Sequence, residues 1–375
     1  MTPPTLVISI NASWNIVNFR AGLIRGLQEA GYRVVALAPR DRWSDRLGEL
    51  GVEFHEIEMD RKGLSPAKDL GLLRRYRGAL RRLSPDAFLG YTAKPNVWGS
   101  LAAQSLGIPV VNNVSGLGTA FIRGGWLGRL VAALYRLAFR RSATVFFQNE
   151  EDRDLFVARR IVAAGKAKLL PGSGIDTRRF QPAPAAGDED RPFVFLLIAR
   201  LLRDKGVGEY VEAARRVRRE APGTRFRLVG FLDADNRSAI SRAELEEWVD
   251  EGLIDYPGPS DDVRPAIAEA DCIVLPSYRE GLPRTLLEAA AMGKPLIATD
   301  VPGCRQVVRH GVNGLLCAVR DPGSLAAAML EMLRAPAERR AGWGRAARAI
   351  VEAEYDERIV VESYLAAVRA ALGGT

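Results

Sequence analysis

The chain has few of the residues on which disulfide and histidine chemistry depend. Its three cysteines, Cys272, Cys304 and Cys317, lie far apart and lack the spacing of metal ligands, so we expect free thiols in a reducing compartment. Its two histidines, His55 and His310, are isolated from each other, and neither is placed like a catalytic residue. These absences argue against a disulfide framework and against histidine-based catalysis.

Long apolar runs are also absent from the 375 residues. No stretch approaches the roughly 20 residues that a transmembrane helix needs, and the N-terminal Met1-Thr-Pro-Pro lacks the basic region of a signal peptide. The charge is uneven: residues 1–180 carry a net charge of +12 and residues 181–375 a net charge of −4, within a total of +8. A basic first half predicts that this half faces an anionic partner, either nucleic acid or a membrane.

Apolar runs alternate with helical patterns along the chain, which predicts parallel sheets covered by helices. In the first half we expect strands at 6–10, 33–38, 52–57, 87–90, 110–112 and 144–147. The second half repeats the scheme, with strands near Phe193, Phe226, Ile254, Ile273, Leu296 and Leu315. The pattern predicts an α/β protein with two doubly wound, Rossmann-like domains that face each other across a cleft.

The most informative pattern lies between Glu280 and Glu288. Residues 271–276 form a short apolar run typical of a buried strand, and residues 283–292 predict a helix with Gly293 as its C-terminal cap. The N-terminus of a helix offers free N–H groups and the positive end of its dipole, which together bind phosphate. At about 1.5 Å of rise per residue, Glu288 lies roughly 8 Å along the helix. A diphosphate at the helix start would therefore have one carboxylate beside each end.

A second segment supports this interpretation. Residues 191–198 predict a buried strand, and Arg200 and Lys205 follow it, at the edge of a parallel sheet where ligands bind in open α/β folds. Two cations at this edge could neutralise a diphosphate leaving group. Each segment alone also fits a solvated charged turn, and it is the combination that favours a nucleotide-sugar site.

Together these residues resemble the family 4 retaining glycosyltransferases of the GT-B fold. The shared motifs cover nearly the whole chain: Glu280 with Glu288, Arg200 with Lys205, Gly172-Ser-Gly-Ile-Asp176 with Phe180, and Gly311-Val-Asn-Gly-Leu315. Three further segments resemble the bacterial branch of this family that builds polysaccharides and lipid-linked oligosaccharides. They are Pro276-Ser-Tyr-Arg-Glu-Gly-Leu-Pro283, Asp300-Val-Pro-Gly-Cys-Arg305 and Thr92-Ala-Lys-Pro-Asn96. The last of these is similar to the undecaprenyl-diphosphate-sugar N-acetylgalactosaminyltransferases.

The resemblance implies roles for particular residues. Arg200 and Lys205 would hold the diphosphate and stabilise the charge that develops as the glycosidic bond breaks, while Glu280 would bind the donor sugar. The implied donor-binding residues, with Glu288 at the ribose and the base near Tyr256, are Gly230, Tyr256, Gly258, Gly281, Leu282, Arg284, Thr285 and Glu288. The implied acceptor-binding residues are Asn15, Asn18, Lys94, Asn96, Asn113 and Ser115.

The resemblance also implies a division into domains. Residues 1–172 would bind the acceptor, with a C-terminal helix at about 355–375 crossing back to them, and residues 173–354 would bind the nucleotide-sugar donor. The chain departs from the family pattern at Ser115, near the place where many members carry a histidine, which argues against a histidine-dependent role. Asp233-Ala-Asp235 matches the metal motif of a different glycosyltransferase fold. The resembled family needs no metal, so we expect neither a metal nor a cofactor.

Two basic segments of the first half, residues 70–83 and 126–141, predict helices that mix arginine with leucine and aromatic residues. The first fits an ordinary crossover helix with a solvated basic face. The second favours contact with an anionic bilayer, where aromatic side chains lie at the level of the lipid head groups. We therefore expect a cytoplasmic protein that is peripheral on the inner face of the cell membrane, and no nucleic-acid partner.

The predicted function is that of a retaining, metal-independent hexosyltransferase. It would move a sugar, an N-acetylhexosamine such as GalNAc, from a UDP-sugar to a polyprenyl-diphosphate-linked saccharide in bacterial surface-glycan or glycoprotein-glycan assembly. One alternative is a nucleotide-sugar 2-epimerase on the same fold, which would need acid–base groups at the sugar C2. The other is a non-catalytic scaffold that binds a nucleotide sugar at the membrane. Incubation with the donor separates the three: an epimerase turns over the donor alone, a transferase waits for the acceptor, and a scaffold does nothing.

Overall fold

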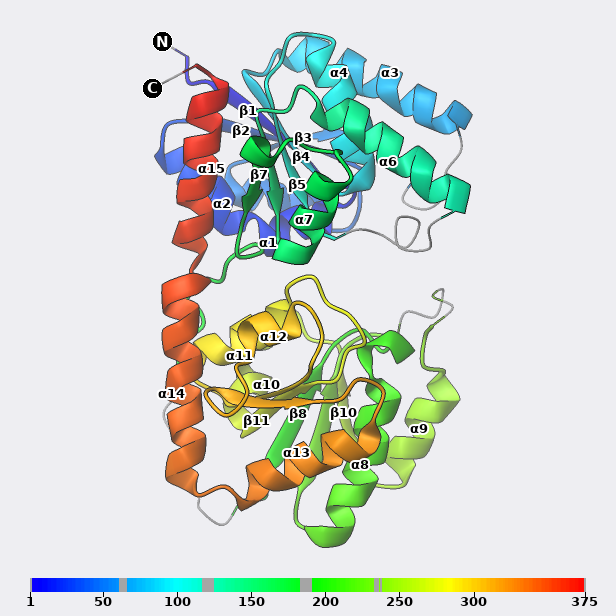
Figure 1. Cartoon of the computed structure of the whole chain (residues 1–375), viewed down its shortest axis with the longest axis vertical. Helices are drawn as coiled ribbons and strands as arrows, with labels where there is room; N and C mark the ends of the chain where they lie inside the picture. Colours follow the sequence, from blue (N-terminus) through cyan, green and yellow to red (C-terminus); the bar gives the residue numbers. More distant parts are fainter. Residues whose placement is uncertain are drawn as a thin grey trace. The chain divides into compact units, whose positions relative to one another are not determined.

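The computed structural model describes residues 2–60, 66–116, 125–182, 191–232, 236 and 238–373, apart from the side chains of 66–67 and 125–127. The chain divides into two compact units, residues 1–174 with 357–375, and residues 175–356. Each unit is built on a parallel sheet with helices on both faces (Figure 1). The alternation of strands and helices expected from the sequence is confirmed in both.

The sheet of the first unit has seven parallel strands in the order β3-β2-β1-β4-β5-β6-β7. The strands are β1 (Thr5–Ser9), β2 (Arg33–Ala38), β3 (Glu53–Glu56), β4 (Ala87–Tyr91), β5 (Val110–Val114), β6 (Thr144–Phe147) and β7 (Ala167–Leu169). The central strands β1, β4 and β5 are buried along their whole length, which explains their nearly continuous apolar runs. All six strands predicted for the first half are confirmed, with ends that differ by one or two residues.

Helices cover both faces of this first sheet. They are α1 (Ser13–Phe19), α2 (Ala21–Glu29), α3 (Pro66–Leu83), α4 (Ser100–Gln104), α6 (Gly125–Phe139), α7 (Glu150–Ala158) and α15 (Glu357–Ala371), with short helical turns at Ser44–Leu50, Pro95–Gly99 and Ala164–Lys166. Helices α2 and α15 pack on one face, and α3 and α4 on the other (Figure 1). Gly26 lets α2 and α15 approach, since a Cβ there would lie 2.3 Å from a methyl group of Val361.

The second unit has six parallel strands in the order β10-β9-β8-β11-β12-β13. The strands are β8 (Val194–Ile198), β9 (Arg225–Val229), β10 (Asp255–Gly258), β11 (Cys272–Leu275), β12 (Leu296–Thr299) and β13 (Gly314–Cys317). The helices are α8 (Val207–Glu220), α9 (Arg242–Asp250), α10 (Arg264–Glu269), α11 (Arg284–Ala291), α12 (Cys304–Val307), α13 (Pro322–Arg334) and α14 (Ala337–Glu354), with a 3₁₀ turn at Arg203–Lys205. The six predicted strand positions are confirmed. Because β8 and β11 are neighbours, the loops that follow them emerge side by side at one edge.

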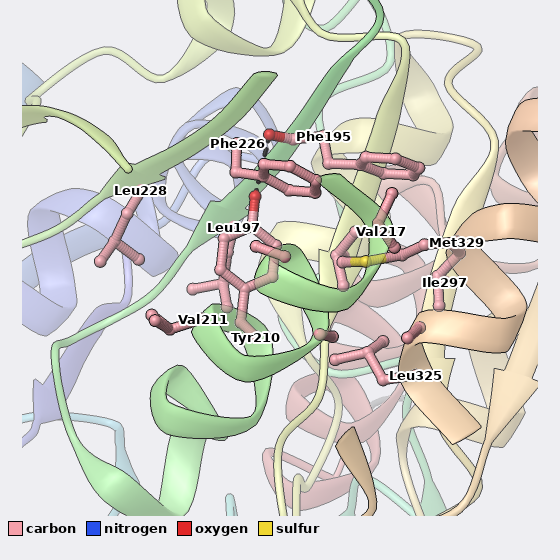
Figure 2. Close-up of a cluster of buried hydrophobic side chains, with 14 of the residues drawn as sticks. Phe195, Leu197, Tyr210, Val211, Val217, Phe226, Leu228, Ile297, Leu325 and Met329 are labelled. Carbon is pink, nitrogen blue, oxygen red and sulfur yellow. Dashed lines mark hydrogen bonds between the residues drawn. The ribbon is translucent and has the colours of Figure 1, made fainter. Parts of the chain in front are cut away.

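A buried cluster fixes α8 against this second sheet (Figure 2). The ring of Tyr210, on α8, is fully buried beside Phe195 and Phe226 of the sheet, and its hydroxyl donates to the carbonyl of Phe195 at 2.9 Å. Burial together with a satisfied hydroxyl is what a core tyrosine needs. The cluster sets the position of the first turn of α8, where Lys205 and Gly206 precede the helix.

The C-terminal segment contains a helix where one was expected, at about 355–375. Helix α14 ends at Glu354, and α15 spans Glu357–Ala371. Helix α15 packs with α2 and β5 in the first unit. Its Tyr364 is buried there and accepts a hydrogen bond from the amide of Asn113 at 3.1 Å.

Candidate functional site

The turn between β8 and α8 carries the predicted diphosphate cations. Arg200 follows the end of β8 and its side chain is exposed, whereas Lys205 closes the 3₁₀ turn that precedes α8. Gly206 has φ +72, and a Cβ there would lie 2.1 Å from the carbonyl oxygen of Pro276. The close approach requires glycine at this position, and it presses the turn against the loop that follows β11.

The structure brings two of the three predicted catalytic residues together. The Nζ atom of Lys205 lies 2.6 Å from Oε1 of Glu280, and the two side chains are 20% and 14% exposed. A charged pair that is only partly solvated has a strong Coulomb attraction, but it also loses hydration. An anionic ligand that takes the ammonium group would release the carboxylate for a neutral polar partner, such as a sugar hydroxyl.

The loop that carries Glu280 is held from two sides. On one side, the hydroxyl of Tyr278 donates to Glu209 of α8 at 2.6 Å, and its backbone N–H donates to the carbonyl of Asp204 at 2.9 Å. On the other side, a Cβ on Gly303 would lie 2.4 Å from the carbonyl oxygen of Gly281, so the segment before α12 touches this loop through backbone alone. The Lys205 turn and the Glu280 loop are therefore positioned as one assembly.

The helix after this loop begins one residue later than predicted. Pro283 is the N-cap of α11 rather than a residue of its first turn, with ψ 108 in the extended region, and Arg284 is the first helical residue. No side chain caps this N-terminus and no acidic residue lies in the first turn. The orphan N–H groups of the first turn suit an anion. Gly281 and Leu282 lie in the preceding bend, and the hydroxyl of Thr285 donates to the carbonyl of Ile198 at 3.2 Å.

Glu288 is largely buried, with 12% of its side chain exposed, and its carboxylate accepts from Nε of Arg284 at 2.7 Å. Burial raises the pKa of the Glu288 carboxyl, while the positive charges of Arg284 and Arg179 oppose that rise and Asp262 adds to it. Asp262 is itself paired with Arg264, which lowers the pKa of the Asp262 carboxyl. A carboxyl in such a place can bind hydroxyl groups without competition from bulk water.

Arg179 and Asp262 are neighbours of Glu288 that were not predicted from the sequence. Arg179 lies directly before Phe180 in the motif that begins at Gly172, and this position was a signal that could have been used. Asp262 lies in the loop after β10, next to the predicted base-binding segment. Their proximity to Glu288 comes from packing between distant segments, which residue spacing alone does not reveal.

The residues predicted to bind the base contact one another. The hydroxyl of Tyr256 donates to the carbonyl of Gly230 at 2.7 Å, and the N–H of Gly230 donates to the carbonyl of Gly258 at 3.2 Å. A Cβ on Gly230 would lie 1.7 Å from the carbonyl oxygen of Ala199, so only glycine fits there. Burial raises the pKa of the Tyr256 phenol. These contacts fix the loops after β8, β9 and β10 to one another.

In the first unit, three predicted acceptor residues belong to one polar network. The amide nitrogen of Asn96 donates to the carbonyl of Asn113 at 2.8 Å, and its oxygen accepts from Asn112 at 2.9 Å. Asn96 and Asn113 are 1% and 0% exposed, and Ser115 donates to Asn113 at 3.1 Å. Direct contact between an acceptor and either asparagine would require these hydrogen bonds to be exchanged.

The other three predicted acceptor residues have local partners. Lys94 forms an ion pair with Asp69 at 3.0 Å, in which the side chains are 16% and 6% exposed. The amide of Asn15 donates to the side chain of Asn11 at 3.2 Å, and that of Asn18 to the carbonyl of Trp14 at 2.9 Å. Asn15 and Asn18 therefore lie on α1, and Lys94 lies just beyond β4, before the helical turn at Pro95–Gly99.

The described residues contain no group of three or more side chains that could hold a metal ion. Asp233 and Asp235, whose spacing matched a metal motif, lie outside the described residues. The three cysteines are buried free thiols. Burial is the main cause that raises the pKa of the Cys304 thiol to about 12, and the charge of Glu280 contributes to the rise. A thiol in this state is a poor nucleophile and a poor metal ligand.

Two family models match the chain, one in each half. The model described as "Glycosyl transferase 4-like domain" matches residues 16–172, and the model described as "Glycosyl transferases group 1" matches residues 192–335. The chain belongs to the family 4, group 1 glycosyltransferases. In this glycosyltransferase the second match spans β8 to α13, and so includes the Lys205 turn, the Glu280 loop and Glu288.

Individual relatives agree with this assignment. The glycosyltransferase is 29% identical over 371 residues to the N,N'-diacetylbacillosaminyl-diphospho-undecaprenol alpha-1,3-N-acetylgalactosaminyltransferase of Campylobacter jejuni, covering 95% of this chain and 96% of that protein. It is 24% identical over 282 residues to a UDP-Gal:alpha-D-GlcNAc-diphosphoundecaprenol alpha-1,3-galactosyltransferase of Escherichia coli, covering 72% of each. Its fold is similar to that of Anabaena HepE in complex with UDP and glucose, with a TM-score of 0.81, 18% identity, and 98% and 100% of the two chains covered. The predicted GT-B fold is confirmed.

Proposed function

We propose that this glycosyltransferase moves an N-acetylhexosamine, such as GalNAc, from a UDP-sugar to a saccharide linked to a polyprenyl diphosphate. The acceptor class is supported by the names of the Campylobacter jejuni and Escherichia coli relatives, both of which act on undecaprenyl-diphosphate sugars. The donor class is supported by the second of these names and by the UDP bound in the HepE complex. In this proposal residues 173–354 bind the donor, and residues 1–172 with the C-terminal helix bind the acceptor.

The observation that carries the proposal is the ion pair of Lys205 with Glu280 beside the uncapped N-terminus of α11. When the donor binds, its diphosphate would take the positive charges of Lys205 and Arg200 together with the N–H groups at the start of α11. Glu280, released from Lys205, would accept hydrogen bonds from the donor sugar. Glu288 would accept hydrogen bonds from the ribose.

We propose further that the reaction keeps the configuration of the anomeric carbon and needs no metal ion. The cations Arg200 and Lys205 would supply the charge stabilisation that a divalent metal supplies in other enzymes, acting on the leaving diphosphate as the glycosidic bond breaks. We assign no histidine the role of a base: the backbone N–H of Leu316 donates to Nδ1 of His310 at 3.0 Å, and Nε2 of His55 lies 2.6 Å from the carboxylate of Glu53. The proton of the acceptor hydroxyl would pass to a phosphate oxygen of the leaving group.

Contact with an anionic membrane is also part of the proposal. No helix in the described part of the chain is long and apolar enough to span a bilayer. Helix α6 exposes Leu130 (44%) and Leu137 (54%) beside exposed arginines, an arrangement that suits the interface of an anionic bilayer. Flotation with anionic vesicles tests this part: binding should increase with anionic lipid and decrease with salt, and an absence of binding would refute it.

The donor is tested by a thermal-shift screen of nucleotide sugars. A donor at 100 times its dissociation constant stabilises the folded state by about 2.7 kcal/mol, which raises the midpoint of unfolding measurably. We expect UDP-GalNAc or another UDP-N-acetylhexosamine to give the largest shift. The same donor should stay intact without acceptor. Isomerisation of the donor alone would indicate an epimerase, and stabilisation without any turnover would indicate a scaffold.

A further inference from the structure

A basic groove lies at the C-terminal ends of α6 and α7, and none of its lining residues is among those assigned above to the donor or the acceptor. Its cavity volume is about 450 Å³. The residues that line this α6–α7 groove are Arg136, Phe139, Arg140, Val157, Arg160, Ile161, Val162, Ala163, Ala164 and Lys166. Four of them are cations and none is acidic, so the groove has a strongly positive potential.

The cations of the groove have no acidic partner within the described part of the chain. Arg136 donates to the carbonyls of Arg160 and Arg159, at 3.0 and 2.8 Å, and Lys166 donates to the carbonyl of Arg140 at 3.1 Å. A carbonyl fixes the position of a cation but leaves its charge uncompensated. By contrast, many exposed arginines of this protein are paired with carboxylates, as Arg334 is with Glu220.

Helix capping accounts for only part of this arrangement. Cations are favourable near the C-terminus of a helix, where carbonyl groups lack hydrogen-bond partners. Arg136 donates to such a carbonyl at the end of α7, and Lys166 donates to one just beyond the end of α6. Among the residues that the structure describes, the side chains of Arg140 and Arg160 make no such contact, and both border the same cavity. Arg160 is held there by a left-handed backbone with φ +52, which is unusual for a residue other than glycine. Two cations therefore remain available to a ligand.

The floor of the groove is apolar. Phe139, Ile161 and Val162 are 1%, 2% and 5% exposed, and they separate the cations from the rest of the first unit. The neighbouring surface of α6 exposes Leu137, 54% accessible, next to Arg136. A ligand suited to this place has a compact anionic group for the arginines and an apolar portion continuing along α6. Soluble phosphates have only the first of these features.

We propose that the α6–α7 groove binds the phosphate of an anionic lipid head group, with Arg140 and Arg160 as its main contacts. The inference rests on the membrane contact proposed above and adds a defined site to it. Diffuse attraction between a basic surface and an anionic bilayer depends on the number of charges and hardly on where they lie. A site in the groove instead predicts that vesicle affinity depends far more on Arg140 and Arg160 than on two exposed arginines outside the groove.

The experiment compares two double variants of equal charge. The groove variant combines Arg140→Gln with Arg160→Asn, because asparagine tolerates the left-handed backbone. The control variant combines Arg129→Gln with Arg141→Gln, both exposed and outside the lining of the groove. Affinity is measured by flotation and by titration with vesicles of phosphatidylcholine containing phosphatidylglycerol. We expect the groove variant to bind at least about tenfold more weakly than the wild type and the control variant to lose less than about threefold.

Several outcomes would overturn the groove site. Equal losses in the two variants would show a diffuse electrostatic attraction in its place. Binding of sn-glycerol 3-phosphate that the groove variant abolishes, while its vesicle binding is unchanged, would show a site for free phosphates. Thermal unfolding of both variants checks that they are folded. Turnover of a water-soluble acceptor by the wild type involves no vesicle, so failure of the proposed transfer reaction would be recognised separately from failure of the groove.

Discussion

Replacing Gly206 by alanine tests whether the Lys205 turn must press against the loop after β11. A Cβ at this position would lie 2.1 Å from the carbonyl oxygen and 2.7 Å from the carbonyl carbon of Pro276, both of them backbone atoms. The left-handed backbone, with φ +72, costs a residue other than glycine about 1–2 kcal/mol. Relief of the clash requires a movement of roughly 1 Å and costs about another 1–3 kcal/mol. We therefore expect Gly206→Ala to lower the free energy of unfolding by at least about 2 kcal/mol.

The effect on activity should be larger than the effect on folding. Lys205 directly precedes Gly206, so the movement that relieves the clash separates the Lys205 ammonium from the Glu280 loop. A displacement of about 1 Å in a catalytic group can lower turnover about 100-fold. The melting temperature should fall by roughly 5 °C or more, given about 2–4 °C for each kcal/mol in a unit of this size.

The same helix provides a matched control. Nothing lies within 4 Å of a Cβ built on Gly208, two residues further on in α8. Gly208→Ala should therefore raise the helix stability by about 0.5–1 kcal/mol and leave turnover near that of the wild type. Differential scanning fluorimetry and a sugar-transfer assay measure both properties. If Gly206→Ala behaves like Gly208→Ala in both assays, the proposed contact between the turn and Pro276 is wrong.

Three further predictions concern charges and hydrogen bonds of the candidate site. Arg200→Ala or Lys205→Ala should lower turnover at least about 100-fold with little change in melting temperature, and near-normal kcat in both variants would exclude them from the mechanism. Glu288→Gln should weaken binding of UDP in calorimetry, whereas Glu280→Gln should leave UDP binding intact and reduce sugar transfer. Equal effects of both variants on UDP affinity would contradict the placement of Glu288 at the ribose and Glu280 at the donor sugar. Tyr278→Phe removes the hydrogen bond to Glu209 and should lower kcat more than it changes UDP affinity, and an unchanged kcat would contradict its positioning role.

Glu288 also predicts a dependence of stability on pH. Burial raises the pKa of its carboxyl above the ordinary value of 4.5, so the folded state binds this proton more tightly than the unfolded chain. The contribution of this group to stability is therefore full below pH 4.5 and is lost as the pH rises toward the folded-state pKa. Glu288→Gln should remove that part of the pH dependence of the unfolding free energy, as measured by urea titration without ligand. An unchanged pH profile would contradict the assigned burial.

The sheets could be predicted from the sequence, and so could the position of Lys205 and Glu280 in turns that follow two strands, for one physical reason. Buried parallel strands are continuous apolar runs, and the loops after neighbouring strands such as β8 and β11 meet at one edge. The ion pair of Lys205 with Glu280 was not predicted. The surroundings of Glu288 could not be predicted in the same way. Asp262 and Arg179 reach it from segments whose approach depends on the packing of side chains rather than on strand order.

Whether Asn96 and Asn113 contact a ligand could not be decided from the sequence, for a different reason. The resemblance implied contacts with an acceptor, but both side chains are buried and already bonded. The amide of Asn96 bonds to the backbone carbonyl of Asn113 and to the side chain of Asn112, whereas the amide of Asn113 bonds to Tyr364 and Ser115. A buried amide must find a partner, and the sequence does not say whether that partner is protein or ligand. The role of both residues in binding the acceptor stays a prediction.

The central claim is tested most directly by a transfer reaction with UDP-GalNAc and a short-chain polyprenyl-diphosphate saccharide. We predict that UDP is released only when both substrates are present, that a chelator such as EDTA leaves the rate unchanged, and that NMR of the product shows an α-linked sugar, the configuration of the donor. Release of UDP that does not depend on the acceptor, or a β-linked product, would contradict the proposed retaining transfer.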